Sequence, residues 1–445
     1  MKIRAIALCL AAIVVALATH IDRTPASVAS GAPAPAGSLS AEAVQTAASA
    51  AELARLISVF EGRVKEHTDE LEYLFLGKLY LQRARSTGDV GSYAQAEAAL
   101  DRALALYPED PDARASMARL RYATHDFAGA AKMATAILVA DPMDAGASAI
   151  LGDAALELGD YAAASDRFTE LANRFPNAAA VDARLARLAF LRGDSGGARE
   201  LADRAEVEAR AEGAFGVDLA WYAHLRAQIN FDRGDYELAA TCEKEALSIA
   251  PAYYVAEAGL ARSSAAQGLI DDAIAHYERA IAAVPQPEYL AALGDMYTLR
   301  GDPSLAKRAY DTVEIIANLS PLKQRLYDRQ FALFYLDHDR DLERALSVAE
   351  GSLALRPDVY GYDIYAWALY KVGRYAEAAA ASGRALAMGT PDARFHYHSG
   401  LIALALGEAG QGKAELRRAL ATGPAFDPLL ATRARETLAV LRALE

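Results

Sequence analysis

Apolar residues along this chain recur at helical spacing in pairs of short segments, and a polar turn separates the two segments of each pair. In residues 145–176 the apolar positions are Leu151, Ala155 and Leu158, followed by Tyr161, Ala164, Phe168 and Leu171. Gly159 and Asp160 interrupt the pattern, and Pro176 ends the second segment because proline cannot continue a helix. Neither short helix can bury its apolar face alone, so the unit is expected to stack on copies of itself.

Further copies of this two-helix unit are indicated by a regular series of prolines, at Pro108, Pro142, Pro176, Pro251, Pro285, Pro357, Pro391 and Pro424. Neighbouring prolines are mostly 34 residues apart, and two longer gaps of 75 and 72 residues each hold one copy without the proline and a short insertion. This pattern resembles the tetratricopeptide repeat family over residues 70–425. The resemblance implies an all-α, right-handed superhelical solenoid of about ten stacked helix-turn-helix repeats, with a C-terminal capping helix over residues 426–445.

The N-terminus differs from the repeats. Lys2 and Arg4 precede a short apolar run over residues 5–18, which is typical of a secretory signal peptide; an uncleaved anchor is the alternative. Residues 19–41 are rich in Pro, Ala, Ser and Gly and predict a flexible linker, and residues 42–69 predict an N-terminal helical layer. We therefore expect a bacterial protein that is exported to the periplasm or secreted, or held at the membrane by its N-terminus.

Composition narrows the classes of partner. Hydrophobic residues make up 53% of the chain, but much of this content is alanine, and aromatic residues make up only 8%. This composition favours closely packed helices over a sheet. The net charge is −13 and no block of Lys or Arg offsets it, so neither a nucleic-acid groove nor binding to an anionic membrane surface is expected. Cys9 lies in the predicted signal peptide, which leaves Cys242 as a small buried hydrophobic residue without a disulfide partner.

Two short motifs resemble catalytic sequences. Residues 193–197 read GDSGG, as in the nucleophile segment of trypsin-like proteases, but that chemistry requires a converging histidine, and His125 is the only upstream candidate beyond the linker. The segment also occupies the place of an inter-helix turn. Residues 407–413 fit GxxxxGK, yet Ala414 follows where a P-loop needs Ser or Thr to hold magnesium.

No metal or cofactor site is expected either. His396 and His398 are two residues apart and so point to different sides of a helix, and residues 337–339, Asp-His-Asp, fit a solvated turn at a helix end. We therefore predict no catalytic residue, no metal, no cofactor and no small-molecule substrate.

The family resemblance implies that the first helices of the repeats line a concave groove. Aromatic residues interleaved with arginines there would form a peptide-binding surface of Arg119, Tyr122, Arg184, Arg187, Phe190, Trp221, Phe231 and Arg262. The alternative is that the aromatic rings pack between neighbouring first helices while the arginines pair with local acids.

A second, apolar patch is predicted near the C-terminus, at Tyr327, Phe331, Phe334, Ile364, Tyr365, Tyr397 and Leu401. It could accept an amphipathic helix, mediate self-association or pack against the capping helix. The sequence thus predicts a non-enzymatic scaffold that binds a peptide or helix of a partner, in an envelope, secretion or polysaccharide assembly. A self-assembling structural scaffold is the alternative, and a nucleotide-binding or enzymatic protein is a remote one.

Overall fold

The computed structural model describes residues 50–319 and 321–443, so the predicted signal peptide and linker lie outside the described residues. The described residues form helices and no strands. They divide into two compact units, one ending at Ala154 within α8 and the other beginning at Ala155. None of the described helices is both long and apolar enough to cross a bilayer.

The first unit contains five helices and most of a sixth. They are α3 (Ala50–Glu66), α4 (Glu70–Thr87), α5 (Gly91–Leu106), α6 (Pro111–Ala123), α7 (Phe127–Ala140) and α8 (Ala145–Glu157), of which α8 runs into the second unit. Helices α4 and α5 pack against each other as the first helix pair, α3 packs against α4, and α6 pairs with α7.

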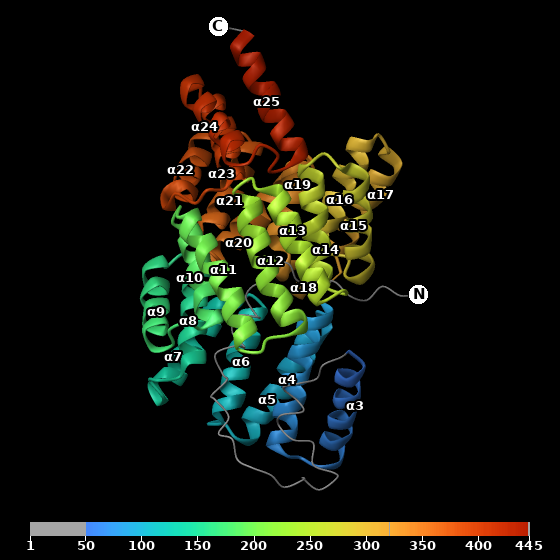
Figure 1. Cartoon of the computed structure of the whole chain (residues 1–445), viewed down its shortest axis with the longest axis vertical. Helices are drawn as coiled ribbons and strands as arrows, with labels where there is room; N and C mark the ends of the chain where they lie inside the picture. The colour runs from blue at the N-terminus through green and yellow to red at the C-terminus, as the bar shows by residue number, and fades with distance from the viewer. Residues whose placement is uncertain (1–49, 320, 444–445) are drawn as a thin grey trace. The chain divides into compact units, whose positions relative to one another are not determined.

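The second unit continues the pairs towards the C-terminus (Figure 1). Its first half contains α9 (Tyr161–Arg174), α10 (Ala179–Leu191), α11 (Ser195–Ala211), α12 (Gly216–Asp232), α13 (Tyr236–Ile249), α14 (Tyr254–Ala266), α15 (Ile270–Ala283), α16 (Pro287–Arg300) and α17 (Pro303–Ala317). Its second half contains α18 (Pro321–Leu326), α19 (Asp328–Asp337), α20 (Leu342–Leu355), α21 (Val359–Lys371), α22 (Tyr375–Ala385), the 3₁₀ turn η1 (Leu386–Met388), α23 (Ala393–Ala405), α24 (Ala409–Thr422) and α25 (Pro428–Ala443).

Ten helix pairs are therefore present in the described residues, from α4 and α5 to α23 and α24, which confirms the helical solenoid expected from the sequence. The irregular spacing of the prolines has two structural causes. Helices α11 and α12 are each extended to 17 residues, and the short α18 is inserted between α17 and α19.

Recurring Gly-Asp pairs build the turns between the two helices of many repeats. Gly159 and Gly193 end first helices with φ angles of 74° and 84°, a left-handed conformation that costs glycine little. The following Asp160 and Asp194 accept hydrogen bonds from backbone N–H groups at the start of the second helix, at 3.0 and 2.8 Å. The same two residues thus stop one helix and start the next.

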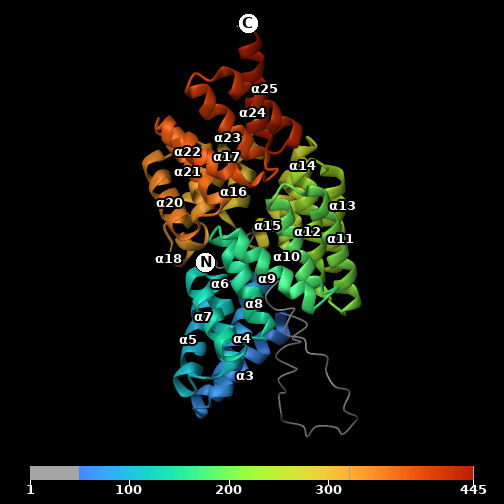
Figure 2. The ribbon, with the colours of Figure 1, turned by 90° about the vertical axis from the view of Figure 1, so that its left-hand side faces the viewer.

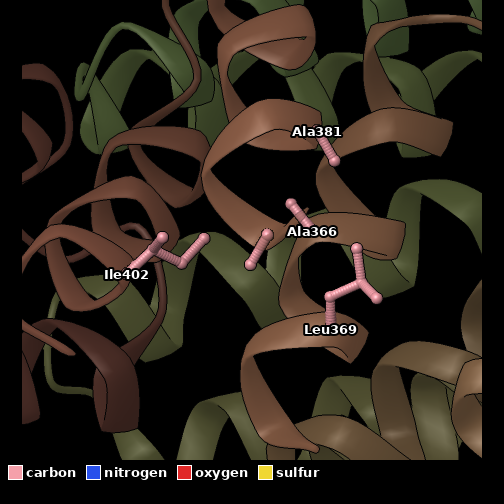
Figure 3. Close-up of a cluster of buried hydrophobic side chains, with 5 residues drawn as sticks. Ala366, Leu369, Ala381 and Ile402 are labelled. Carbon is pink, nitrogen blue, oxygen red and sulfur yellow. The ribbon is translucent and has the colours of Figure 1, made fainter. Parts of the chain in front are cut away.

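Small apolar residues fill the space between the paired helices. Figure 3 shows one such cluster, in which Ala366 and Leu369 of α21 lie with Ala381 of α22 and Ile402 of α23. Ala366 and Leu369 are fully buried. Alanine side chains are small, so they allow the axes of the paired helices to approach closely. The many alanines of the chain serve this close packing.

The second unit also brings together repeats that are far apart in the sequence. Three hydrogen bonds join them: Val359 N–H donates to Tyr161 Oη (2.9 Å), Ala425 N–H donates to Tyr236 Oη (2.9 Å), and Thr390 Oγ1 donates to the Leu191 carbonyl (2.7 Å). We call this contact the repeat closure. It places the turns around α9, α10 and α13 against the segments that precede α21, α23 and α25.

Candidate functional site

The structure places most of the predicted central groove residues in the packed interior. Tyr122, Arg184, Phe190, Trp221 and Phe231 are buried, Arg119 and Arg187 are half-buried, and Arg262 is exposed. Trp221 packs edge-on against the neighbouring Tyr222, with ring centroids 4.9 Å apart. The aromatic members of this set therefore contribute to helix packing rather than to an open surface.

Two arginines of that set pair with acids of the preceding repeat. Arg187 donates to Glu157 at 2.6 Å, and Arg262 donates to Asp232 at 3.0 Å while lying over the ring of Phe231 at 3.6 Å from its centroid. These pairs match the alternative considered from the sequence, in which the arginines bind local acids.

The predicted apolar patch is also mostly interior. Tyr327, Phe331, Phe334, Ile364 and Tyr397 are buried, whereas Tyr365 and Leu401 are half-buried. Tyr365 packs against the α21–α22–α23 cluster of Figure 3. The patch is therefore core in this conformation, because its rings fill the spaces between first helices.

The inner face of the second unit is formed by first helices. Helix α12 contacts α10 and α14 (Figure 2). Helix α19 contacts α16 and α21, and α21 in turn contacts α23. First helices that touch across repeats lie on the inner side of the curve, because the inner radius of a solenoid is the shorter one. Charged side chains from these helices and from their flanking turns interact with one another there. We call them the inner charge cluster: Asp232, Arg262, Glu288, Asp295, Asp337, Asp392, Arg394 and Asp427.

Arg394 is the centre of the best-connected part of this cluster. Its guanidinium donates to Asp337 at 2.7 Å and to Asp427 at 3.2 Å. Asp337 also accepts from the indole N–H of Trp367 at 2.9 Å, and Asp295 lies 2.8 Å from Nε2 of His338. The next residue, Asp339, accepts a hydrogen bond from Lys371. The three consecutive residues 337–339 therefore contact different neighbours and do not form one site.

Within the inner charge cluster, six carboxylates outnumber two guanidinium groups. Burial, together with Asp232 and Asp363, raises the pKa of Asp392 to about 6. Burial likewise raises the pKa of Asp232, Glu288 and Asp427 despite nearby arginines. Carboxylates held in this way have too little positive charge around them, and an added cationic group would stabilise them.

The sequence contained only a weak signal for this cluster. Asp232 and Asp337 are the last residues of first helices, while Asp392 and Asp427 immediately precede or cap the helices that follow them. Acids near helix ends are ordinarily explained by solvation and capping. Only the curvature of the repeats brings these helix ends to the same side.

The motifs that resemble catalytic sequences serve the fold. Asp194 of GDSGG caps α11, and Ser195 is its first residue. In residues 407–413, α24 begins at Ala409, and a Cβ at Gly412 would lie 3.0 Å from the Gly400 carbonyl oxygen and collide with Leu404. That glycine is needed for the contact between α23 and α24.

His396 and His398 are likewise each paired with one acid. His396 Nδ1 lies 2.7 Å from Glu415, and His398 Nδ1 lies 3.0 Å from both oxygens of Asp363. Within the described ranges, no group of three or more His, Cys, Asp or Glu side chains is arranged to hold a metal ion. Cys242 is buried, and burial raises the pKa of its thiol to about 11.

Comparison with solved structures returned helical-repeat proteins at low identity. The crystal structure of the APC/C hetero-tetramer Cut9-Hcn1 is 15% identical, covers 88% of this chain and 95% of that chain, and has a TM-score of 0.32. The human IFIT1 dimer with m7Gppp-AAAA is 14% identical, covers 84% and 86%, and has a TM-score of 0.47. PilW, described as a widely conserved type IV pilus biogenesis factor, is 17% identical, covers 48% and 97%, and has a TM-score of 0.40. Nothing about the function of this chain follows from them.

No curated protein matches the sequence. Tetratricopeptide repeat models match residues 89–153, 151–215, 259–321 and 366–427, which together cover more than half of the chain. The helix pairs and the matched repeats agree, and the chain belongs to the tetratricopeptide repeat family.

Proposed function

We propose that this protein is a scaffold that binds an extended, basic segment of a partner protein on the inner face of its second unit. Tetratricopeptide repeats imply a protein-interaction scaffold, typically a non-enzymatic one. The observation that carries the finer proposal is the excess of carboxylates in the inner charge cluster. It supports lysine or arginine side chains on the bound segment.

The geometry of Glu288 supports this assignment. Glu288 lies in the first turn of α16, where its side chain reaches solvent but is surrounded by other repeats. It interacts electrostatically with Arg262, Arg394 and His224 from three other first helices. A partner segment that runs along the groove past several repeats would therefore meet the Glu288 carboxylate. A cation placed there would offset the desolvation cost that the surrounding repeats impose on the carboxylates of Glu288 and Asp392.

The test uses fluorescence anisotropy with three labelled twelve-residue peptides that alternate alanine with lysine, glutamine or glutamate. We expect the lysine peptide to bind at least tenfold more tightly than the other two, and its affinity to fall with added salt. The triple variant Glu288→Gln/Asp392→Asn/Asp427→Asn should weaken binding about tenfold or more, because each lost charge contact contributes roughly 0.5–1 kcal/mol. Asparagine retains the capping oxygens at Asp392 and Asp427.

A matched control removes three exposed carboxylates outside the cluster, in Glu200→Gln/Glu343→Gln/Glu436→Gln. This variant has the same change in net charge and should bind the lysine peptide nearly as well as the wild type. If both variants lost the same affinity for the lysine peptide, the binding would depend on the overall negative charge of the protein. That result would contradict a site in the groove.

We further propose that this scaffold works outside the cytoplasm, in an envelope, secretion or polysaccharide assembly. The support is the basic, then apolar, sequence of residues 1–18. Cell fractionation with N-terminal sequencing of the mature protein tests it. A cytoplasmic protein with an intact first residue and no membrane association would rule it out.

A further inference from the structure

The insertion that breaks the 34-residue spacing creates a cavity in the second unit. The extra helix α18 separates α17 from α19, and beside it lies a cavity of about 220 Å³. Its wall is formed by Ala317, Gln324, Phe331, Tyr335, Arg344 and Val348. For comparison, an apolar cavity of roughly 150 Å³ binds benzene, so this volume accommodates an aromatic ring with a short substituent.

The wall combines apolar surface with one cationic group. Ala317 and Phe331 are buried, and Val348 is half-buried. The guanidinium of Arg344 stacks on the ring of Tyr335, 5.2 Å from the centroid, and donates to Asn318 Oδ1 at 3.2 Å. Among the described residues, no carboxylate lies within ion-pair distance of this guanidinium.

The nearby acids are engaged elsewhere. Glu314 accepts from Arg340 at 2.6 Å, and Asp341 accepts from the backbone N–H of Arg344 as the cap of α20. The hydroxyl of Tyr335 is buried and has no hydrogen-bond partner among the described residues. A half-buried guanidinium without an acid and a buried hydroxyl without a partner are both groups that a carboxylate satisfies.

We propose that this cavity binds a carboxylate attached to a compact apolar group, with the apolar part against Phe331 and Val348 and the carboxylate on Arg344. Two sources share this chemistry: a small aromatic or branched acid, and the C-terminal residue of a peptide that ends in an apolar side chain. The site is separate from the inner charge cluster and does not depend on the basic segment proposed above.

The experiment is calorimetric titration of the full chain with phenylacetate and with its neutral analogue, phenylacetamide. A second pair consists of a short peptide ending in phenylalanine, with a free or an amidated C-terminus. We expect at least one carboxylate probe to bind at millimolar concentration or below, and at least tenfold more tightly than its neutral analogue. Binding of phenylacetate alone identifies a small acid, whereas binding of the free-ended peptide alone identifies a protein C-terminus.

The variant Arg344→Gln should abolish the preference for the carboxylate, and Val348→Phe, which narrows the cavity, should weaken both members of a pair. Arg384→Gln is the matched control, because Arg384 also stacks on a tyrosine and donates to Tyr362 Oη at 3.0 Å but does not line the cavity. Helix content and melting temperature check that each variant is folded. The proposal is overturned if neither carboxylate binds up to 10 mM (roughly −3 kcal/mol of binding free energy), or if folded Arg344→Gln keeps the preference.

Discussion

At the scale of single residues, the environment of a side chain in the second unit is set by repeats that are distant in the sequence. Asp392 illustrates this, since Asp232 and Asp363 act on it from α12 and α21. Burial and these two negative neighbours raise the pKa of Asp392 to about 6, against 3.8 for an ordinary aspartate. The folded protein therefore binds this proton more tightly than the unfolded chain does.

The first prediction concerns the pH dependence of Asp392→Asn. Because the folded-state pKa is the higher one, the wild type loses stability relative to the variant as the pH rises from about 4 to about 6. Above pH 6 we expect the variant to be more stable by roughly 1–2 kcal/mol, since one pKa unit corresponds to about 1.4 kcal/mol and partial access to water weakens the effect. The cap on α23 survives because asparagine also accepts from Arg394 N–H.

Denaturant unfolding of both proteins at pH 4, 5, 6 and 7 measures this difference. The two should be nearly equally stable at pH 4, where both side chains are uncharged. If the stability of the wild type instead increased relative to that of the variant with rising pH, the folded protein would stabilise the Asp392 carboxylate. That result would contradict the prediction.

At the scale of the helical element, the Gly-Asp turn is the signal that the sequence displayed most plainly. Asp194 accepts from Gly197 N–H at 2.8 Å, whereas Asp235 occupies the same position before α13 without a side-chain capping bond. The same aspartate is part of GDSGG, so its role in the cap accounts for a motif that otherwise resembles catalytic chemistry.

The second prediction is therefore a comparison of caps. Asp194→Ala should lower the free energy of unfolding by about 0.5–2 kcal/mol, because an N–H group at the start of α11 loses its acceptor. Asp235→Ala should cost clearly less, and Ser195→Ala should be nearly neutral. Thermal unfolding of the three variants tests the order, and an Asp235→Ala variant as destabilised as Asp194→Ala would show that these costs do not arise from capping.

At the scale of the second unit as a whole, the repeat closure joins early and late repeats. Besides the hydrogen bonds of Tyr161, Tyr236 and Thr390, the turn at Gly193 approaches the Gly389 carbonyl so closely that a Cβ would lie 2.8 Å from its oxygen. Ordinary solenoid repeats contact only their neighbours, so these bonds add restraints that a linear array lacks.

The third prediction tests the closure with Gly193→Ala. Both Gly193 (φ 84°) and Gly373 (φ 82°) have left-handed backbones, so alanine at either position costs about 1–2 kcal/mol in backbone strain. Only Gly193 would also collide with a distant segment, because nothing lies within 4 Å of a Cβ at Gly373. Gly193→Ala should therefore cost roughly 1–3 kcal/mol more than Gly373→Ala.

Hydrogen exchange provides a local readout of the same change. Amides in residues 389–392 should exchange faster in Gly193→Ala and remain protected in Gly373→Ala. Equal exchange in the two variants would indicate that the turn at Gly193 does not restrain the late repeats.

The sequence by itself determined the helix pairs, their period and their turns. These features depend on local physics: apolar spacing fits one helix face, Gly-Asp ends one helix and caps the next, and proline ends a pair. The helix pairs begin with α4 at Glu70 and end with α24 at Thr422. The two irregular spacings likewise identified the places where α11 lengthens and α18 is inserted.

The tertiary structure alone decided which side chains face the groove. On a short helix the groove-facing and packing positions are one residue apart, so Trp221 and Phe231 fit both roles in sequence and are buried in the structure. The inner charge cluster, the repeat closure and the cavity at Arg344 depend on how far each repeat turns relative to the last. Such rotations accumulate over many repeats and bring together residues with no local relation in the chain, for which no periodicity provides a signal.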